Sequence, residues 1–128
     1  MKSERIEVLV LPVDGPIVVR EIANGLDAFQ ALVGGYIQAV ILRGQLRGTL
    51  YLDEEGKLND PPKARNHVAT HMAYLMPGDY IAGDAFISGP LDREGCDTSV
   101  EQRVLDVVSG LVGFAVPREA ETEQARRI

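Results

Sequence analysis

The chain has 128 residues, of which 45% are hydrophobic and 25% are charged, and its formal net charge is −6 at pH 7. This size and hydrophobic content fit one compact domain, and the lack of low-complexity runs argues against disorder of the whole chain. The acidic balance argues against direct binding of nucleic acid, because a phosphate backbone needs a basic surface. It favours a basic protein partner, and mimicry of DNA is a further alternative.

The cysteine content and the first residues indicate a cytoplasmic protein. Cys96 is the only cysteine, so no internal disulfide can form, which is typical of a reducing compartment. The apolar run near the start is interrupted by Pro12 and Asp14, and it is too short for a signal sequence or a membrane span.

The first predicted elements are a β-hairpin and a short helix. Two apolar runs, 7–13 and 17–22, flank an Asp-Gly pair, which is typical of a tight hairpin turn. Apolar side chains then recur at helical spacing over 26–33. We expect Asn24 to cap the start of this helix and Gly34 to end it in the left-handed conformation.

A second pair of strands follows this helix. Residues 36–42 are nearly all apolar, which predicts a central strand, and residues 48–52 predict a strand after it. The sequence DEEGKLN over 53–59 predicts a tight turn with Gly56 at a position of positive φ.

The second half of the chain predicts a helix, a strand and a helix. The first helix spans 64–74, with Pro62 at its start, and the strand spans 79–88. The last helix is strongly amphipathic and begins at a capping box formed by Thr98 and Glu101.

The element order β-β-α-β-β-α-β-α predicts an α+β fold with a mixed or mostly antiparallel sheet of about five strands and three helices. We assign residues 1–116 to this single domain and the charged residues 117–128 to a C-terminal tail that frays. Because aromatic residues make up only 5% of the chain and Trp is absent, we expect an aliphatic core that includes Leu105 of the last helix.

Two sequence motifs stand out from this pattern. Residues 33–37 read VGGYI, where a helix ends and a strand begins. Residues 54–59 read EEGKLN and are preceded by Asp53. We interpret Gly34, Gly35, Tyr36 and Gly56 as structural residues that cap the helix and form the turn.

A third block and a later strand complete a resemblance to a known family. Pro62 and Arg65 match a P-x-N-R block in which Ala64 replaces Asn, and Asp53 likewise replaces an Asn of the second motif. From about residue 6 to residue 110, the chain resembles phage, plasmid and actinobacterial proteins grouped as domain of unknown function number 3846. The resemblance implies a phage or mobile-element origin and assigns no activity.

One candidate ligand site follows from the positions of the cations. Lys57 and Arg65 flank both a tight turn and the start of a helix, where unpaired N–H groups attract anions. Together with Asn59 and Asn66 they form the candidate binding residues for a phosphate or nucleotide, although no Walker or dinucleotide fingerprint accompanies them. Solvated charges that fix a turn are the alternative interpretation.

No catalytic residue, cofactor or metal site is predicted. Ser88 and Ser99 lack a nucleophile elbow, and Cys96 has no basic neighbour beyond Arg93 to activate it. His67 and His71 are spaced to share a helical face, but a zinc site needs at least three protein ligands.

We therefore expect a small, non-catalytic accessory protein of a phage or mobile element that binds a host macromolecule, with a role in host takeover or anti-defence. The expected partner is a host protein, and the expected location is the host cytoplasm. The alternatives are a protein that binds or sequesters nucleotides through Lys57, Asn59 and Arg65, and an acidic DNA mimic.

Overall fold

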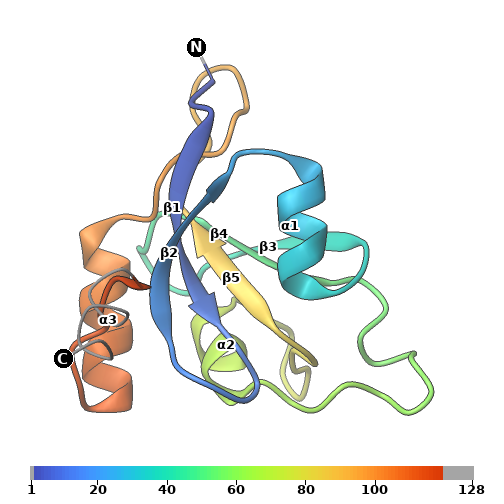
Figure 1. Ribbon diagram of the computed structural model, residues 1–128. Coiled ribbons are helices and arrows are strands. Elements are labelled where there is room, and N and C mark those ends of the chain that lie inside the picture. Colours follow the sequence, from blue (N-terminus) through green and yellow to red (C-terminus); the bar gives the residue numbers. More distant parts are fainter. Residues whose placement is uncertain (1, 120–128) are drawn as a thin grey trace, which may run out of the picture.

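The computed structural model describes residues 2–119, which fold as a five-stranded antiparallel sheet with three helices (Figure 1). The predicted α+β fold is therefore confirmed. The strands are β1 (Arg5–Leu11), β2 (Val18–Ala23), β3 (Ile37–Ile41), β4 (Thr49–Asp53) and β5 (Ala85–Ser88). The helices are α1 (Leu26–Val33), α2 (His67–Met72) and α3 (Gln102–Val112).

The strand order in the sheet is β2-β1-β5-β4-β3. Two hairpins, β1–β2 and β3–β4, flank β5, which is buried along its whole length and pairs with β1 and β4. The prediction of a central strand over 36–42 is wrong, because β3 lies at an edge and all five of its residues are exposed or half-buried. The insertion of β5 depends on long-range pairing that a local apolar pattern does not reveal.

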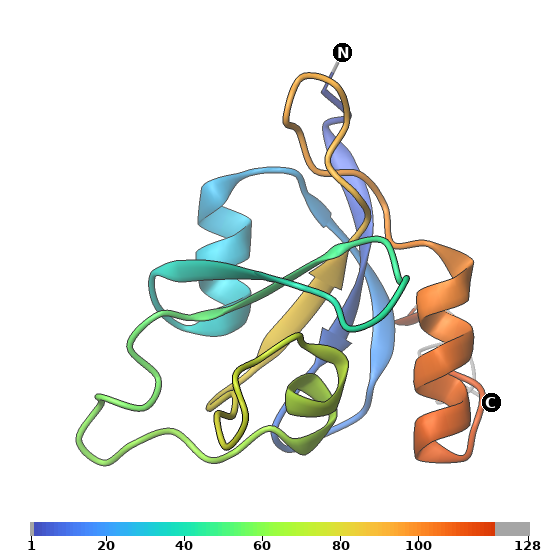
Figure 2. The same cartoon turned by 180° about the vertical axis from the view of Figure 1, so that it is seen from behind.

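The sheet separates two hydrophobic clusters. Phe29 and Val33 of α1 pack on one face, while Met72 of α2 and Val104 of α3 pack on the other. Figures 1 and 2, which view the molecule from opposite sides, show α1 on one face and α2 on the other, with α3 beside β2. Leu105 is buried in the second cluster, as predicted.

The expectation of an aliphatic core holds for only one of the two clusters. Phe29, Tyr51 and Phe86 form a compact group beneath α1, with ring centroids 5.1–5.2 Å apart. Such aromatic contacts stabilise a core beyond their buried area. Three of the few aromatic residues are thus concentrated in one place, which composition alone does not reveal.

The predicted starts of the first and last helices need correction. Gly25 is the N-cap of α1, whereas Asn24 is buried and its amide donates to the carbonyls of Ser3 and Asp97, both at 3.0 Å. Glu101 is the N-cap of α3 without a side-chain cap. The predicted capping box is therefore absent.

Thr98, the other expected member of that box, has a different role. Its hydroxyl donates to the carbonyl of Pro90 at 2.6 Å and so closes the loop after β5. Short polar side chains near a helix start have such local alternatives to capping. The predicted end of α1 is right, because Gly34 has φ 73° and its N–H donates to the carbonyl of Gln30.

Two predicted elements are shorter in the structure than in the sequence pattern. The helix expected over 64–74 is limited to α2, and the strand expected over 79–88 is limited to β5. Gly83 has φ 91°, which interrupts extended pairing just before β5. The freed segment 73–84 forms an irregular wall beside β3 and β4, and it is central to the site described below.

The outer edge of β2 is covered by the end of the described chain. The Val19 N–H donates to the carbonyl of Pro117 at 2.9 Å, and Val19 forms a parallel bridge with Arg118. Arg20 forms an ion pair with Glu119 at 2.7 Å. Residues 117–119 of the predicted tail thus lie along β2, and its remainder, 120–128, is outside the described residues.

Candidate functional site

The VGGYI and EEGKLN motifs meet at Asp53, at the end of β4. The Asp53 carboxylate occupies the space where a side chain on Gly35 would lie, since a Cβ there would be 2.6 Å from Asp53 Oδ1. Gly35 is therefore needed for close approach, and Gly34 for positive φ. Both predicted structural glycines of this motif have a physical reason to be glycine.

Asp53 forms a buried ion pair with Lys63, whose Nζ is 2.6 Å from Asp53 Oδ2. The Asp53 side chain is only 4% exposed. The same ammonium donates to the carbonyls of Val33 and Gly34 at 2.9 and 3.2 Å, so it satisfies the C-terminal end of α1. One lysine thus joins the helix end, the strand end and the loop that precedes α2.

The carboxylate of Asp53 is held in its charged form. Burial raises the pKa of Asp53, but hydrogen bonds from Lys63 and the Glu55 N–H, the Lys63 charge and the Asn59 side chain together lower it below its usual value. Asn59, a predicted ligand residue, is therefore part of this polar cluster.

The turn after Asp53 differs from its prediction at Gly56. Gly56 does not have positive φ, because it is absent from the positive-φ glycines of the described chain. It is nevertheless sterically required, since a Cβ would lie 2.6 Å from the carbonyl oxygen of Ala82. The turn is pressed against the irregular segment 73–84, and its glycine permits this contact.

The predicted anion site is rearranged in the structure. Lys57 and Arg65 do come together, but on the ring of Tyr80, with Lys57 Nζ 4.5 Å and Arg65 Cζ 4.2 Å from the ring centroid. Lys57 also forms an ion pair with Asp79, and this contact lowers the pKa of the Asp79 carboxyl. The two cations therefore have aromatic or acidic partners already.

Asn66 is a structural residue rather than an exposed ligand contact. It is buried, its amide donates to the carbonyls of Leu11 and Gly83, and its side-chain oxygen caps the Ala69 N–H at 3.0 Å. The start of α2 thus has its own cap, and Pro62 lies well before it. Asn66 therefore satisfies one of the helix-start amides on which the predicted anion site depends.

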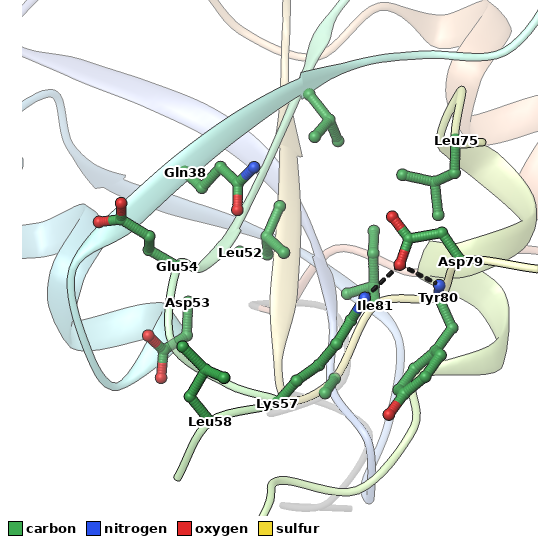
Figure 3. Close-up of a pocket in the computed structure, with 12 residues that line it drawn as sticks. Gln38, Leu52, Asp53, Glu54, Lys57, Leu58, Leu75, Asp79, Tyr80 and Ile81 are labelled. Carbon is green, nitrogen blue, oxygen red and sulfur yellow. Dashed lines mark hydrogen bonds and ion pairs between the residues drawn. The ribbon is translucent and has the colours of Figure 1, made fainter.

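A cleft of about 240 Å³ lies between the sheet and the irregular segment (Figure 3). Figure 3 shows Gln38, Leu52 and Glu54 on one side and Leu75 and Tyr80 on the other. The remaining lining residues are Val40, Asp53, Lys57, Leu58, Asp79, Ile81 and Ala82. The cleft has an apolar floor and an acidic rim.

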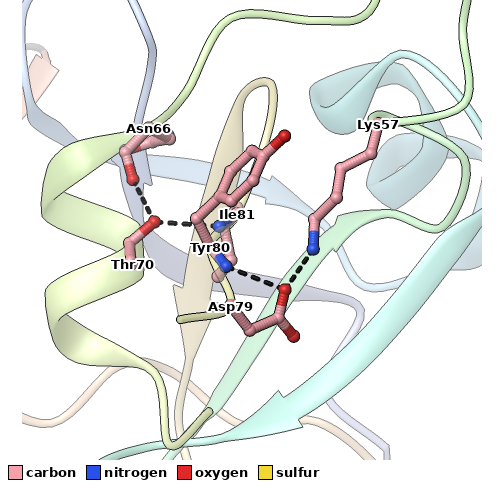
Figure 4. Close-up of polar contacts among 6 residues, drawn as sticks. All are labelled: Lys57, Asn66, Thr70, Asp79, Tyr80 and Ile81. Atoms are coloured by element: carbon pink, nitrogen blue, oxygen red, sulfur yellow. Dashed lines mark hydrogen bonds and ion pairs between the residues drawn. The ribbon is translucent and has the colours of Figure 1, made fainter. Parts of the chain in front are cut away.

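The far wall of the cleft is fixed by a chain of hydrogen bonds (Figure 4). The Thr70 hydroxyl donates to the Asn66 carbonyl at 2.7 Å and accepts from the Ile81 N–H at 2.9 Å. The Tyr80 N–H donates to Asp79 at 2.8 Å, and Asp79 also accepts from Lys57. The wall is therefore tied both to α2 and to the turn on the opposite side, which keeps the cleft open in a defined shape.

Large apolar side chains project around this cleft. Leu58 is 81% exposed, Met76 78% and Tyr74 66%. Tyr74 and Met76 line a second hollow of about 360 Å³, which shares Leu75 and Asp79 with the cleft. Exposed apolar groups gathered beside a hollow are typical of a binding surface, whereas scattered ones are ordinary.

A separate polar cluster lies beneath α1 and has a structural role. Asp97 accepts hydrogen bonds from the hydroxyls of Tyr51 at 2.7 Å and Ser88 at 3.0 Å. Burial, together with this carboxylate, raises the pKa of the Tyr51 hydroxyl. The cluster fastens the loop that carries the half-buried Cys96 to the sheet.

His67 and His71 are both exposed on α2. Within residues 2–119, no group of three or more His, Cys, Asp and Glu side chains is placed to hold a metal ion. No helix in the same range is long and apolar enough to cross a membrane.

Sequence reasoning missed three residues that build the site. Lys63, Asp79 and Tyr80 were not among the candidates, although Lys63 follows a Pro-Pro pair and Asp79-Tyr80 follow a Pro-Gly turn. The interpretation of 79–88 as one strand concealed the last two. Turn-forming dipeptides before polar or aromatic residues were the available signal.

The fold and site define a single-domain α+β protein with a surface cleft whose far wall is hydrogen-bonded to α2. The chain belongs to the family Domain of unknown function (DUF3846), whose model matches residues 6–111. No curated protein and no solved structure matches the chain.

Proposed function

We propose that this protein is a non-catalytic accessory protein that binds another protein through the cleft and the apolar side chains around it. The observation that carries the proposal is the position of Leu58, Tyr74 and Met76, which are mostly exposed and surround a preformed hollow. The family resemblance implies a phage or mobile-element origin, and we propose that the partner is a host protein in the cytoplasm.

The charges of the site support a protein partner over an anionic ligand. Lys57 is paired with Asp79, and Lys63 with Asp53. Glu54 is exposed, and its carboxylate is in none of the ion pairs formed within the range 2–119. An anion in the cleft would meet this carboxylate, whereas a basic group of a partner would be attracted to it.

The test is capture of a partner on the immobilised full chain from a lysate of the organism whose genome carries the gene. We expect the wild type and Leu91→Asp to retain the same protein, since Leu91 is 52% exposed but does not line either hollow. Leu58→Asp and Met76→Asp should lose it, because a charge is placed where the partner buries apolar surface. Equal capture by all four proteins would contradict the proposal.

A nucleotide-binding protein is the second candidate, and the Tyr80 ring with Arg65 beside it favours this alternative. Aromatic rings and guanidinium groups can stack on bases and contact phosphates. Calorimetric titration with mono-, di- and cyclic nucleotides tests it. Binding that is lost in Arg65→Ala would favour this alternative, and the absence of heat at millimolar ligand would remove it.

A further inference from the structure

The hydrogen-bond register of β3 shows which of its backbone groups face β4. The Glu54 N–H donates to the Tyr36 carbonyl at 2.8 Å, immediately before β3 begins. Because hydrogen-bonded pairs alternate along an antiparallel ladder, Gln38 and Val40 are the β3 residues that bond to β4. The backbone groups of the residues between them point away from β4.

These outward-pointing groups belong to Ile37, Ala39 and Ile41. Residues 72–74 occupy the far end of this edge, where the Ile41 carbonyl accepts from the Tyr74 N–H at 2.9 Å. Within the described part of the chain, no other segment forms a backbone hydrogen bond to the outward groups of Ile37 and Ala39. Among residues 2–119, the edge is therefore unpaired from Ile37 to Ala39. Residues 72–74 show how an extended segment pairs with the rest of this edge.

The open edge lies directly beside the cleft. Val40 lines the cleft from β3, and Leu75, which follows the paired residues 72–74, lines it from the other side. Side chains of a strand added along β3 would alternate between the two faces of the sheet. Those on the cleft face would lie next to Val40 and Gln38, and the one beside Val40 would contact Leu75.

The position beside Val40 would select an apolar side chain of the added strand, and the position beside Gln38 would select for charge. Glu54 and Gln38 both line the cleft, and Figure 3 shows them on the same side of it. A long basic side chain placed beside Gln38 would extend over it toward the unpaired Glu54 carboxylate. The apolar and basic positions are two residues apart, as same-face residues of a strand must be.

We propose that β3 accepts an extended segment of a partner protein as a sixth strand, and that the segment carries an apolar residue and a Lys or Arg in the pattern apolar-x-basic or its reverse. This inference rests on the proposed function, because it specifies how the cleft recognises its partner. Main-chain hydrogen bonds to Ile37 and Ala39 supply affinity, and the cleft and Glu54 supply specificity, as in other cases of strand addition.

The opposite edge of the sheet supports this assignment. β2 carries Arg20 and Glu21 and is covered by residues 117–119, whereas β3 has no charged residue between its ends. Charges and covering segments are the usual protection of an edge strand against pairing. Among the described residues, the edge beside the cleft carries no charge within its strand, and residues 72–74 cover only its far end.

The test begins with selection of random eight-residue peptides, displayed on phage, against the immobilised full chain. We expect the selected peptides to share the apolar-x-basic pattern. Synthetic peptides of that consensus are then titrated into wild type, Ala39→Pro and Ala39→Val. Proline removes only an outward N–H of an edge strand, while valine keeps it.

We expect Ala39→Pro to weaken binding about tenfold and Ala39→Val to leave it within about twofold, since a main-chain hydrogen bond is lost only in the first. N-methylation of alternate peptide amides should weaken binding to the wild type by a similar factor. This second measurement does not alter the protein, so it still tests the inference if Ala39→Pro fails to fold.

Val40→Asp separates the two proposals. Loss of binding in Val40→Asp with full binding in Ala39→Pro and to N-methylated peptides would overturn strand addition and leave the cleft as the binding site. A chain that dimerises in size-exclusion chromatography, and reverts to a monomer in Ala39→Pro, would show a second copy as the occupant and overturn the peptide assignment. Failure to select any peptide with the predicted pattern would overturn it as well.

Discussion

The two edges of the sheet are stabilised in different ways. The β2 edge has packing beneath it from α3, a covering segment at 117–119 and surface ion pairs such as Arg20–Glu119. The β3 edge has no charged residue of its own, and its start is fixed from within by the buried Asp53–Lys63 pair. A protein can thus cover and charge one edge of its sheet while leaving part of the other edge unpaired.

This difference assigns distinct energetic roles to polar groups in the two regions. Exposed ion pairs contribute little because water screens them, whereas a buried pair is costly to break since one charge is left without a partner. We expect apolar packing to contribute most of the stability on the β2 side, and polar interactions to contribute most of it on the β3 side. Four measurements test this comparison.

The largest expected effect is on the β2 side. Leu105→Ala should lower the free energy of unfolding by about 2–5 kcal/mol, because it empties a buried position of the cluster that α3 forms with the sheet. Val107→Ala is the control on the same helix, since Val107 is 41% exposed, and we expect a change within about 0.5 kcal/mol. Equal losses of stability in urea denaturation would contradict the packing assigned to α3.

The next effect is on the β3 side. Lys63→Met should lower the free energy of unfolding by about 3 kcal/mol, because the buried Asp53 carboxylate loses its cation and the end of α1 loses a donor. Lys57→Met is the matched control, because its partner Asp79 is exposed, and its urea midpoint should stay close to that of the wild type. A Lys63→Met midpoint no lower than that of Lys57→Met would refute the central role of this pair.

The pH dependence of stability also tests the contribution of the Asp53–Lys63 pair. The folded-state pKa of Asp53 lies below its unfolded value of about 3.9, so its contribution is present above that value and is lost as pH falls through the folded pKa. Asp53→Asn should therefore destabilise the protein at pH 6 and lose less stability than the wild type between pH 6 and pH 3. Parallel acid limbs in thermal denaturation of the two proteins would show that another carboxylate is responsible.

The smallest effect concerns the surface pair on β2. A double-mutant cycle of Arg20→Ala and Glu119→Ala should give a coupling energy between 0 and about 1 kcal/mol, since both side chains are more than a third exposed. The coupling should decrease further in 0.5 M salt. A coupling as large as the effect of Lys63→Met would erase the distinction between the two edges.

Local patterns were sufficient for part of the fold. The helix that ends at Gly34, the first hairpin and the amphipathic face with Leu105 followed from periodicity and turn residues, because these features are encoded within a few neighbouring positions. The position of β5 between two hairpins did not follow from the sequence, since pairing over long sequence distances has no local signature. The same reason explains why 36–42 looked central.

The candidate site was predicted only in part. Lys57 and Arg65 do converge, but on Tyr80, whose position depends on a loop that the sequence presented as a strand. Asn66 was correctly placed beside a helix start, yet it serves the helix itself. Polar residues near a turn can bind a ligand or fold the chain, and only the hydrogen-bond partners distinguish these roles.

The compact turn between Asp53 and Lys63 has a consequence for how the chain can vary in length. Its backbone is bonded at Gly56, Leu58, Asn59 and Lys63, and it closes over Asp53. An inserted residue there would displace the lysine from the carboxylate, so we infer that this interval has a fixed length. The connection between β3 and β4 is exposed over 43–45, with open space around Gly44, so insertions and fused tags should be accommodated there instead.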